Sequence, residues 1–403
     1  MNAHQNTPDT SASLSRPLSS SWRLLPEWHT QLGVLLAWPH ADTDWREQLA
    51  STQATYLELI HAISTVEVVW LIVPNAAVEA EFKHLWTHFL TQTSRRATPA
   101  QHLKLITAPY DDTWLRDTGP LSLSSHTATP LTPPATGAAT SDTPITPDTS
   151  ILKLATFRFN GWGNKFPHQR DRVLAEYLCH HQLFWQHDIL AKASFESIDL
   201  IAEGGNIETN GAGILLTQTH CLRHDNRPNG LSTQDWERVF QHRLGMEQIW
   251  WLDHGQIAGD DTDGHIDTLV RFVAPDHLVY QRCDEADYPF ADSLARLEQQ
   301  LHAWQRDPLY HVNGKAIRLS ALPWPSPIVD DAGERLPATY ANFLIINQRV
   351  LVPIYEVPED QEALSCLQTC FPDRTIIGIP CRPLINQGGS LHCITMQISS
   401  PYG

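Results

Sequence analysis

The chain of 403 residues lacks a hydrophobic segment long enough to cross a bilayer, which takes about 20 apolar residues. Its longest apolar run, at 66–73, is short and contains Glu67. Positive charge is also scarce, since 28 Lys and Arg face 45 Asp and Glu for a net charge of −17. This balance disfavours nucleic acid and anionic membranes as partners and fits a cationic or neutral ligand. The first residues show no basic stretch followed by an apolar one, so we expect a cytoplasmic protein without a secretory leader.

Paired cysteines and metal-binding motifs are missing as well. Seven cysteines are scattered along the chain, and among them only Cys366 and Cys370 are closely spaced. An odd number in a chain of this length is typical of reduced thiols and not of a disulfide scaffold. The 21 histidines form no His-Glu-x-x-His motif, and there is no Cys-x-x-Cys motif. We therefore expect no metal site.

Hydrophobic residues make up 42 % of the chain, enough for a sizeable core, and they alternate between strand-like and helix-like patterns. Strands are expected at 32–38, 67–73, 103–108, 151–159, 213–217, 248–252, 266–273, 316–322, 343–354, 375–379 and 391–398. Helices are expected at 45–64, 76–90, 168–183, 232–243, 286–305 and 360–370. The pattern predicts an α/β fold in which some neighbouring strands form hairpins.

Two segments interrupt this pattern. Residues 1–20 are rich in Ser, Thr, Pro and Asn and are expected to be disordered. Residues 126–150 are rich in Pro, Thr and Ala and are expected to be an exposed loop insertion. No break in composition divides the remainder, so we expect one domain over 21–403.

A cysteine near the C-terminus is the first candidate for chemistry. Cys393 follows a glycine pair, Gly388 and Gly389, which permits a tight turn or a close approach to a ligand. The residues after the turn are expected to form a strand that carries the thiol. Free cysteines are among the most buried residues, so Cys393 by itself is better explained as a core thiol than as a nucleophile.

Two acidic segments could supply a charge clamp and an acid. In 111–120, Asp117 and Trp114 precede a Gly-Pro turn and could line a pocket, or they could simply belong to that turn. In 260–267, His265 and Asp267 are two residues apart and would point the same way on a strand, as an acid/base and a clamp would. The alternative for that segment is a solvated acidic loop, because a bound cation is only one way to relieve the repulsion.

A third segment combines glycines with a carboxylate. Glu203 is followed by two glycines and Asn206, which leaves room for a ligand, whereas Asn210-Gly211 is typical of a hairpin turn. Together, the thiol, the histidine and the carboxylates at 117, 203 and 267 suit attack of a thiolate on a planar cationic carbon.

Seven segments resemble, in order, the agmatine deiminase family, which includes the bacterial-type peptidylarginine deiminases, over about 21–400. They are Trp38-Pro39-His40, Trp114-Leu115-Arg116-Asp117-Thr118-Gly119-Pro120, Phe159-Asn160-Gly161-Trp162-Gly163-Asn164-Lys165, Glu203-Gly204-Gly205-Asn206-Ile207, Gly264-His265-Ile266-Asp267, Tyr340-Ala341-Asn342-Phe343 and Gly389-Ser390-Leu391-His392-Cys393. The resemblance implies the pentein fold, five ββαβ units around a pseudo-fivefold axis with the active site at the centre.

The resemblance also implies a role for each matching residue. Cys393 would be the nucleophile, His265 the general acid/base, and Asp117 and Asp267 the guanidinium clamps, with no metal or organic cofactor. The residues expected at the substrate are Trp114, Glu203, Asp261, Trp38 and Asn206. The implied reaction converts agmatine and water into N-carbamoylputrescine and ammonia, a step of putrescine synthesis.

The chain departs from the family at four places that bear on the substrate, two of which are the insertion at 126–150 and Met396-Gln397 in place of a common Gln-Gln. The lead-in to Cys393 is Gln-Gly-Gly-Ser-Leu-His where many members have Gly-Gly-Gly-Asn-Ile-His, and Asp261 stands where a Glu is common. Free arginine or a peptidyl-arginine is the nearest alternative substrate, with Arg116 and Arg271 as candidates to bind its carboxylate. An inactive guanidine-binding homologue and a metal hydrolase using 260–267 are further alternatives. Oligomerisation is left open.

Overall fold

The structure is a computed structural model that describes residues 21–93, 95, 99–125, 152–181 and 187–402. The expected disordered segment 1–20 and the expected insertion 126–150 lie outside these residues.

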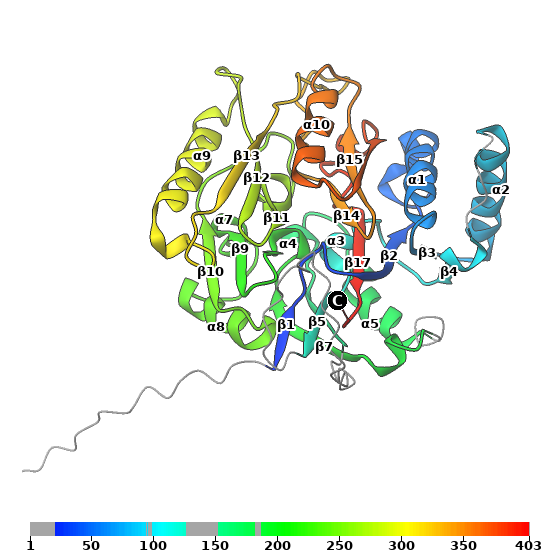
Figure 1. The fold of residues 1–403 in the computed structure, drawn as a ribbon. Coiled ribbons are helices and arrows are strands. Elements are labelled where there is room, and N and C mark those ends of the chain that lie inside the picture. Colours follow the sequence, from blue (N-terminus) through cyan, green and yellow to red (C-terminus); the bar gives the residue numbers. More distant parts are fainter. Residues whose placement is uncertain (1–20, 94, 96–98, 126–151, 182–186, 403) are drawn as a thin grey trace, which may run out of the picture.

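Within the described residues the strands form five separate sheets (Figure 1). In strand order they are β1 (Trp22–Leu24), β5 (Leu121–Ser125), β6 (Leu152–Arg158) and β7 (Ser194–Ile201); β10 (Gln248–Leu252), β9 (Ile214–Gln218) and β8 (Glu208–Thr209); β11 (Val270–Ala274), β12 (His277–Gln281) and β13 (Arg318–Leu322); β14 (Leu344–Ile346), β15 (Arg349–Ile354) and β16 (Thr375–Pro380); and β17 (Thr395–Ser399), β2 (Gln31–Ala37), β3 (Val68–Val73) and β4 (Leu103–Thr107).

One pattern repeats in all five sheets. An antiparallel pair is followed by a helix, and the next strand returns parallel to the second strand of the pair. The helices at this position are α5 (Asp171–His180), α8 (Thr233–Leu244), α9 (Ala291–Arg306), α10 (Asp360–Cys370) and α1 (Leu49–Ser64). In the last sheet the C-terminal strand β17 pairs antiparallel with β2, so the end of the chain completes the unit that its beginning starts. The expected pentein fold of five ββαβ units is confirmed.

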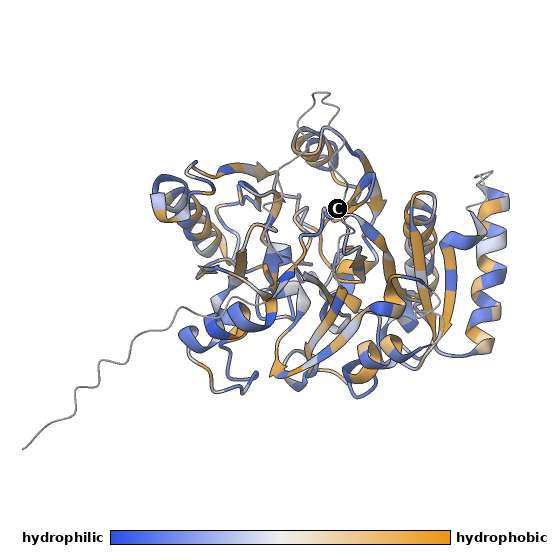
Figure 2. Cartoon of the chain, turned by 60° about the horizontal axis from the view of Figure 1, so that its bottom comes forward, coloured by the Kyte–Doolittle hydropathy of each residue, from blue (hydrophilic) through white to orange (hydrophobic). Residues whose placement is uncertain are grey.

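The sequence of each element explains its place in this arrangement. β3 reads Val-Val-Trp-Leu-Ile-Val and is almost fully buried, as expected for a strand covered on both faces. α9 buries Leu294, Leu297, Leu301 and Trp304, which recur at helical spacing, and leaves the other faces polar. Figure 2 shows apolar residues along the strands and mixed polar and apolar residues along the helices. Figure 1 shows α9 and α10 at the outside of the molecule, and α2 beyond α1 at its right edge.

The other helices in the described residues are short or peripheral. They are α2 (Ala76–Gln92), α3 (Leu115–Thr118), α4 (Gly161–Asn164) and α7 (Thr219–Leu222), with the 3-10 turns η1 (Asp44–Gln48), η2 (Ala100–His102), η3 (Leu190–Lys192), η4 (Gly204–Asn206), η5 (Ile266–Thr268), η6 (Pro308–Tyr310) and η7 (Leu384–Gln387).

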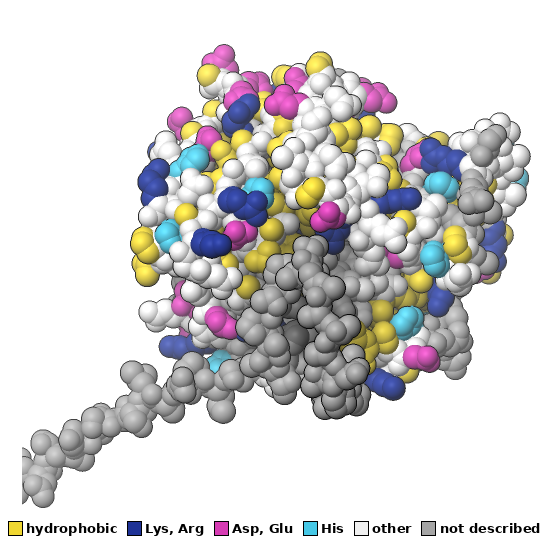
Figure 3. Space-filling model, viewed as in Figure 1, with side chains coloured by type: hydrophobic (Ala, Val, Ile, Leu, Met, Phe, Trp, Pro, Cys, Tyr) yellow, Lys and Arg dark blue, Asp and Glu magenta, His cyan; other side chains and the backbone are white. Residues whose placement is uncertain are grey.

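Among the described helices, none combines the length and the apolar content that crossing a membrane requires. Acidic and basic side chains are interspersed on the face seen in Figure 3, with acidic ones gathered at its upper end.

Most expected elements occur within a few residues of their expected bounds, although the pattern does not predict β1, β5, β7 or β12. The strand expected at 343–354 is two strands, β14 and β15. Two expected strands begin four residues later than predicted, and both changes fall at the candidate chemistry. β11 starts at Val270 and not at 266, and β17 starts at Thr395 and not at 391. The prediction that His265 and Asp267 lie on a strand was therefore wrong, and so was the prediction that a strand carries Cys393.

The two corrections have the same physical cause. The hydroxyl of Thr268 donates to the carbonyl of His265 at 2.9 Å, and the hydroxyl of Thr395 donates to the carbonyl of His392 at 2.9 Å. A hydroxyl bonded to a carbonyl three residues back favours a turn over an extended strand. Both segments consequently end in a tight turn, which the hydrophobic pattern does not reveal.

Candidate active site

The candidate catalytic side chains come from turns at the ends of elements in different units. Asp117 lies in α3, and Glu203 directly precedes η4. His265 directly precedes η5, and Asp267 lies within it. Cys393 precedes β17. α3 packs against η4 and β17, and η4 packs against η5. All five side chains are buried, at 5 % exposure or less. The structure therefore brings together residues up to 276 positions apart, at the point where the units meet.

The thiol of Cys393 is held between an amide and a carboxylate. Its Sγ accepts from Nδ2 of Asn342 at 3.2 Å and lies 3.8 Å from Oδ2 of Asp267. Burial raises the pKa of Cys393 well above its usual value, and the charges of Asp267 and Asp117 raise it further. The thiol is thus neutral until a cation offsets these carboxylates.

His265 lies between two carboxylates. Its Nδ1 is 3.6 Å from Oδ1 of Asp117, and its Nε2 is 3.8 Å from Oε2 of Glu203. Burial lowers the pKa of His265, but the charge of Asp117 and the nearby Cys221 and Glu203 raise it well above the usual value. The imidazole is therefore protonated and able to act as an acid.

Asp267 presents one carboxylate oxygen to the protein and keeps the other free. Oδ2 lies 2.7 Å from Nδ1 of His392, whose Nε2 lies 2.7 Å from Oε2 of Glu27. Burial raises the pKa of Asp267, but the hydrogen bond from His392 and nearby positive charge bring it below the usual value. Oδ1 is buried and has no hydrogen-bond partner among the described residues. An ionised, buried and unpartnered oxygen is costly unless a donor binds there.

Asp117 has both oxygens fixed. Oδ1 accepts from the backbone amide of Gly205 at 2.8 Å, and Oδ2 accepts from the indole of Trp162 at 2.9 Å. Burial raises the pKa of Asp117; the neighbouring His265 opposes that rise, and Asp267 adds to it. A bound guanidinium would relieve the repulsion between Asp117 and Asp267.

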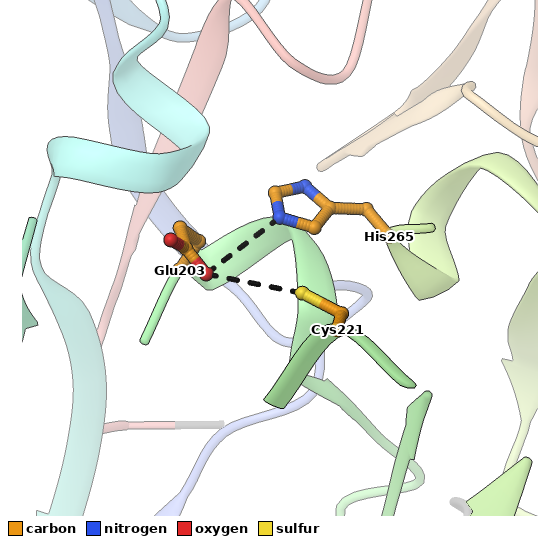
Figure 4. Close-up of side chains that lie close together, drawn as sticks. All are labelled: Glu203, Cys221 and His265. Carbon is orange, nitrogen blue, oxygen red and sulfur yellow. Dashed lines mark hydrogen bonds and ion pairs between the residues drawn. The ribbon is translucent and has the colours of Figure 1, made fainter. Parts of the chain in front are cut away.

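Glu203 faces His265 and not an open pocket. Nε of Arg227 lies 2.9 and 2.8 Å from its two oxygens, and Sγ of Cys221 lies 3.9 Å from Oε2 (Figure 4). Burial raises the pKa of Glu203, but Arg227 and His265 bring it below the usual value. The contacts of Glu203 are those of a group that orients the histidine.

Glu203, Cys221 and His265 place ligand atoms within 4.8 Å of one another and are the one such group of three in the described residues. Arg227 already occupies both oxygens of Glu203, and burial raises the pKa of the Cys221 thiol, so a metal ion would have to displace a cation and a proton. In the acidic segment, Asp260 accepts from the amides of Thr262 and Gly264. With these contacts, neither the Glu203–Cys221–His265 group nor the acidic segment leaves the open coordination position that a catalytic metal ion needs.

The other residues expected at the substrate lie in different surroundings. Trp114 is 7 % exposed, and its ring leaves no room for a side chain at Gly389, where a Cβ would lie 2.3 Å away. Asp261 is exposed, and its Oδ2 would lie 3.3 Å from a Cβ at Gly388. Both therefore border the glycine pair that leads to Cys393.

Trp38 and Asn206 make their contacts outside the group of candidate catalytic side chains. Trp38 is fully buried, with its ring 4.8 Å from that of Phe82 in a core cluster. Asn206 is fully buried, and its Oδ1 accepts from the amide of Gln218 at 3.0 Å. A binding role for these two residues stays a prediction.

Two arginines that could have bound a substrate carboxylate are engaged inside the protein. Arg271 is fully buried and donates to Glu208, to Glu27 and to the carbonyl of Phe343, each at 2.8 Å. Arg116 is 3 % exposed, and its Nη2 lies 3.7 Å from Glu27.

Reasoning from the sequence assigned no role to Asn342, His392, Trp162 or Glu27. The first three stand inside the motif segments and could have been identified there, His392 because it adjoins the nucleophile. Glu27 has no motif around it, and it lies 365 positions from its partner His392, so only the structure identifies it.

A family model, curated relatives and solved structures all relate this chain to deiminases. The family model for the Porphyromonas-type peptidyl-arginine deiminase matches residues 23–399. A Yersinia pestis protein and a Shewanella sp. (strain W3-18-1) protein share the provisional name agmatine deiminase. The first is 30 % identical over 95 % of this chain and 96 % of its own, and the second 29 % identical over 97 % of each.

Two solved structures are similar over nearly their whole length. A substrate-bound variant of C. jejuni agmatine deiminase is 28 % identical, with a TM-score of 0.76, over 95 % of this chain and 97 % of its own. A Porphyromonas gingivalis protein, provisionally named arginine deiminase, is 36 % identical, with a TM-score of 0.75, over 94 % of this chain and 99 % of its own.

Proposed function

The chain belongs to the Porphyromonas-type peptidyl-arginine deiminase family, and from this premise we propose that it is an amidine hydrolase acting on agmatine. The products are N-carbamoylputrescine and ammonia. The reaction belongs to putrescine synthesis, and we place it in the cytoplasm.

One observation carries this proposal: the thiol and the imidazole each lie against one of two buried aspartates. Sγ of Cys393 is 3.8 Å from Asp267, and Nδ1 of His265 is 3.6 Å from Asp117. A planar cation bound between the two carboxylates has its carbon near the sulfur and its nitrogens near the imidazolium. The unpartnered Oδ1 of Asp267 supports the same reading, since a guanidinium N–H is the donor it lacks.

The chemistry follows from the charges around the thiol. A bound cation offsets Asp267 and Asp117, so the Cys393 thiol can release its proton to solvent as the substrate enters. The thiolate forms a bond to the guanidinium carbon, and His265 gives its proton to the departing nitrogen, which leaves as ammonia. A water then gives its proton to His265 and adds to the same carbon. The carbon–sulfur bond breaks, the added hydroxyl gives its remaining proton to solvent, and the neutral ureido product leaves with the thiolate restored.

Agmatine is favoured over arginine by the cations that are already engaged. Arg116 and Arg271, the arginines beside the motifs, are buried against Glu27 and do not offer a free charge to an α-carboxylate. Asp261 at the rim is exposed and carries the charge that suits a cationic tail. Two curated relatives carry the name agmatine deiminase.

Arginine or a peptidyl-arginine is the second candidate. It is favoured by the family's description and by the Porphyromonas gingivalis relative, whose name specifies arginine. Both candidates use the same sulfur chemistry and differ only in what the rim must bind.

The test is incubation with agmatine, arginine and a blocked arginyl peptide, with ammonia and ureido product measured, and with Cys393→Ser as the control. The expected result is product from agmatine with kcat/KM at least about 10-fold above the other two, and none from the variant. Preference for arginine or for the peptide overturns the substrate assignment, and turnover by Cys393→Ser at the native rate overturns the mechanism.

A further inference from the structure

We infer that Asp263 is a positioning residue whose contacts extend to both halves of the proposed catalytic centre, one at His265 and one at Asp117. It stands two residues before His265, and its side chain joins three segments of the chain: 160–165, 226–227 and 260–265. This inference rests on the proposed function, because the two halves are the acid/base His265 and the guanidinium clamp Asp117.

The backbone at Asp263 is held in an uncommon conformation. Its φ is +67°, and Gly264 follows with a φ of +94°. A non-glycine residue in the left-handed region costs energy, and such residues persist where the surrounding contacts hold them. The turn so formed leads directly into His265, whose amide donates to the hydroxyl of Thr262 at 3.1 Å.

The carboxylate of Asp263 accepts hydrogen bonds from three side chains in the other two segments. Oδ2 accepts from Nδ2 of Asn226 at 2.9 Å and from Nη1 of Arg227 at 2.7 Å, and Oδ1 accepts from Nζ of Lys165 at 2.8 Å. Such charge-assisted bonds are stronger than neutral ones. They hold the pKa of Asp263 well below its usual value, against the effect of burial.

One arm leads from Asp263 to the histidine. Arg227 is fully buried at its side chain, and its Nε lies within 2.9 Å of both oxygens of Glu203. Its Nη2 also donates to the carbonyl of Thr262 at 2.9 Å. Glu203 in turn lies 3.8 Å from Nε2 of His265. Asp263 therefore fixes the guanidinium that fixes the carboxylate beside the imidazole.

The other arm leads to the guanidinium clamp. Nδ2 of Asn226 donates to the carbonyl of Trp162 at 3.3 Å, and the indole of Trp162 donates to Asp117 at 2.9 Å. Gly161, Trp162, Gly163 and Asn164 all have positive φ, so this turn is itself strained. A Cβ at Gly163 would lie 2.4 Å from the side chain of Asn226, so the turn and the amide fit closely.

The substitution Asp263→Asn tests this role with little change of shape. Asn tolerates the left-handed region, so the backbone keeps a compatible residue. Its amide cannot accept from Lys165 on one side and from Asn226 and Arg227 on the other, because one end of the amide is a donor. The matched control is Asp199→Asn, which removes a surface pair with Arg158 at a carboxylate that is 86 % exposed.

Two readouts are needed. The first is the pH profile of kcat/KM with agmatine, whose alkaline limb reports the loss of the His265 proton. The second is the rate at which a haloacetamidine, a cation of guanidinium shape, labels Cys393, measured by mass spectrometry. The labelling does not require agmatine to be the substrate. If the wild type is labelled but does not turn over agmatine, the proposed substrate fails while this inference can still be tested.

The charged and titratable groups that face His265 are Asp117, Glu203, Cys221 and Asp267, with Arg227 behind Glu203. Loss of the anion at 263 leaves the positive charge of Arg227 less compensated. We expect the alkaline limb of Asp263→Asn to move to lower pH, and its labelling rate and kcat/KM to fall by about 10- to 100-fold. Asp199→Asn should match the wild type in both readouts.

Asn226→Ala separates the two arms and is the second variant if Asp263→Asn does not fold. It removes the contact toward Trp162 together with the bonds of Asn226 to Asp263 and Arg227, but it leaves Arg227 bonded to both Asp263 and Glu203. It should therefore raise KM and slow the labelling while the alkaline limb stays in place. Unchanged rates in either variant overturn the inference. Loss of activity in Asp263→Asn with an unshifted limb also overturns it, because a purely structural role would give that result.

Discussion

Nδ1 of His392 lies 2.7 Å from Oδ2 of Asp267, and the histidine is the residue directly before Cys393, the proposed nucleophile. The other ring nitrogen of His392 lies 2.7 Å from Glu27. One buried imidazole thus fixes the carboxylate beside the thiol and connects it to a network of buried charges that includes Arg271 and Glu208. The carboxylate of Asp267, the proposed clamp, is therefore fixed by contacts within the protein.

Replacing His392 by Phe should destabilise the protein strongly. The substitution leaves the carboxylates of Asp267 and Glu27 buried without their shared partner, which costs about 3–5 kcal/mol in the free energy of unfolding. Unfolding in urea measures this. The control is His302→Phe, since His302 is 42 % exposed and 3.9 Å from Glu298. The control should change stability by less than about 0.5 kcal/mol, and equal effects of the two substitutions would contradict the bridging role.

Replacing Asp267 by Asn should impair binding and chemistry together. The variant keeps the shape of the side chain but removes one of two charges that hold the cation, so kcat/KM with agmatine should fall by about 100-fold or more. Asp284→Asn is the control, because Asp284 is a surface partner of Arg282 and is 56 % exposed. A loss of less than about 3-fold in Asp267→Asn would argue against a clamp.

The stability of the protein should depend on the proton at His265. Acidic neighbours raise the pKa of His265 in the folded chain well above the usual value of about 6.5. A raised folded-state pKa gives stability that is complete below the unfolded value and is lost as the pH rises through the folded value.

The Tm of the wild type should therefore fall as the pH rises from about 7 upward, and His265→Gln should lose less Tm over that interval. His302→Gln, at an exposed site, should follow the wild type. Parallel curves for the wild type and His265→Gln would show that the proton at 265 does not contribute.

A side chain at position 389 should disturb the pocket wall. The Cβ of Gly389→Ala would lie 2.3 Å from the ring of Trp114, so the ring or the segment before Cys393 must move. Overpacking of this kind costs about 1–3 kcal/mol, and kcat/KM should fall by about 10-fold or more. Gly378→Ala is the milder comparison, because its nearest neighbour is the side chain of Ile354 at 3.1 Å. Full activity in Gly389→Ala would show that the fit against Trp114 is unimportant.

The sequence was sufficient for the architecture and for the residue types of the site, and insufficient for its local geometry. Regular hydrophobic periods mark strands such as β10 and helices such as α10, which have the predicted bounds. The turns at His265 and Cys393 depend on single hydroxyl bonds from Thr268 and Thr395, which leave no periodic trace.

The supporting network could not be predicted because its partners are distant in sequence. Glu27 meets Arg271 across 244 positions and His392 across 365. Neither end of these pairs changes the local pattern, so only the folded chain shows that Arg271 is an internal partner and not a binder of substrate carboxylate.

The central claim is that Cys393 forms a covalent bond to the guanidinium carbon during turnover, and rapid acid quench followed by peptide mass spectrometry tests it most directly. With agmatine in excess, the peptide containing Cys393 should carry the mass of agmatine less ammonia, and His265→Gln should change the amount trapped. Steady turnover with Cys393 found only unmodified at every quench time, or with the adduct on another cysteine such as Cys221, would contradict the account.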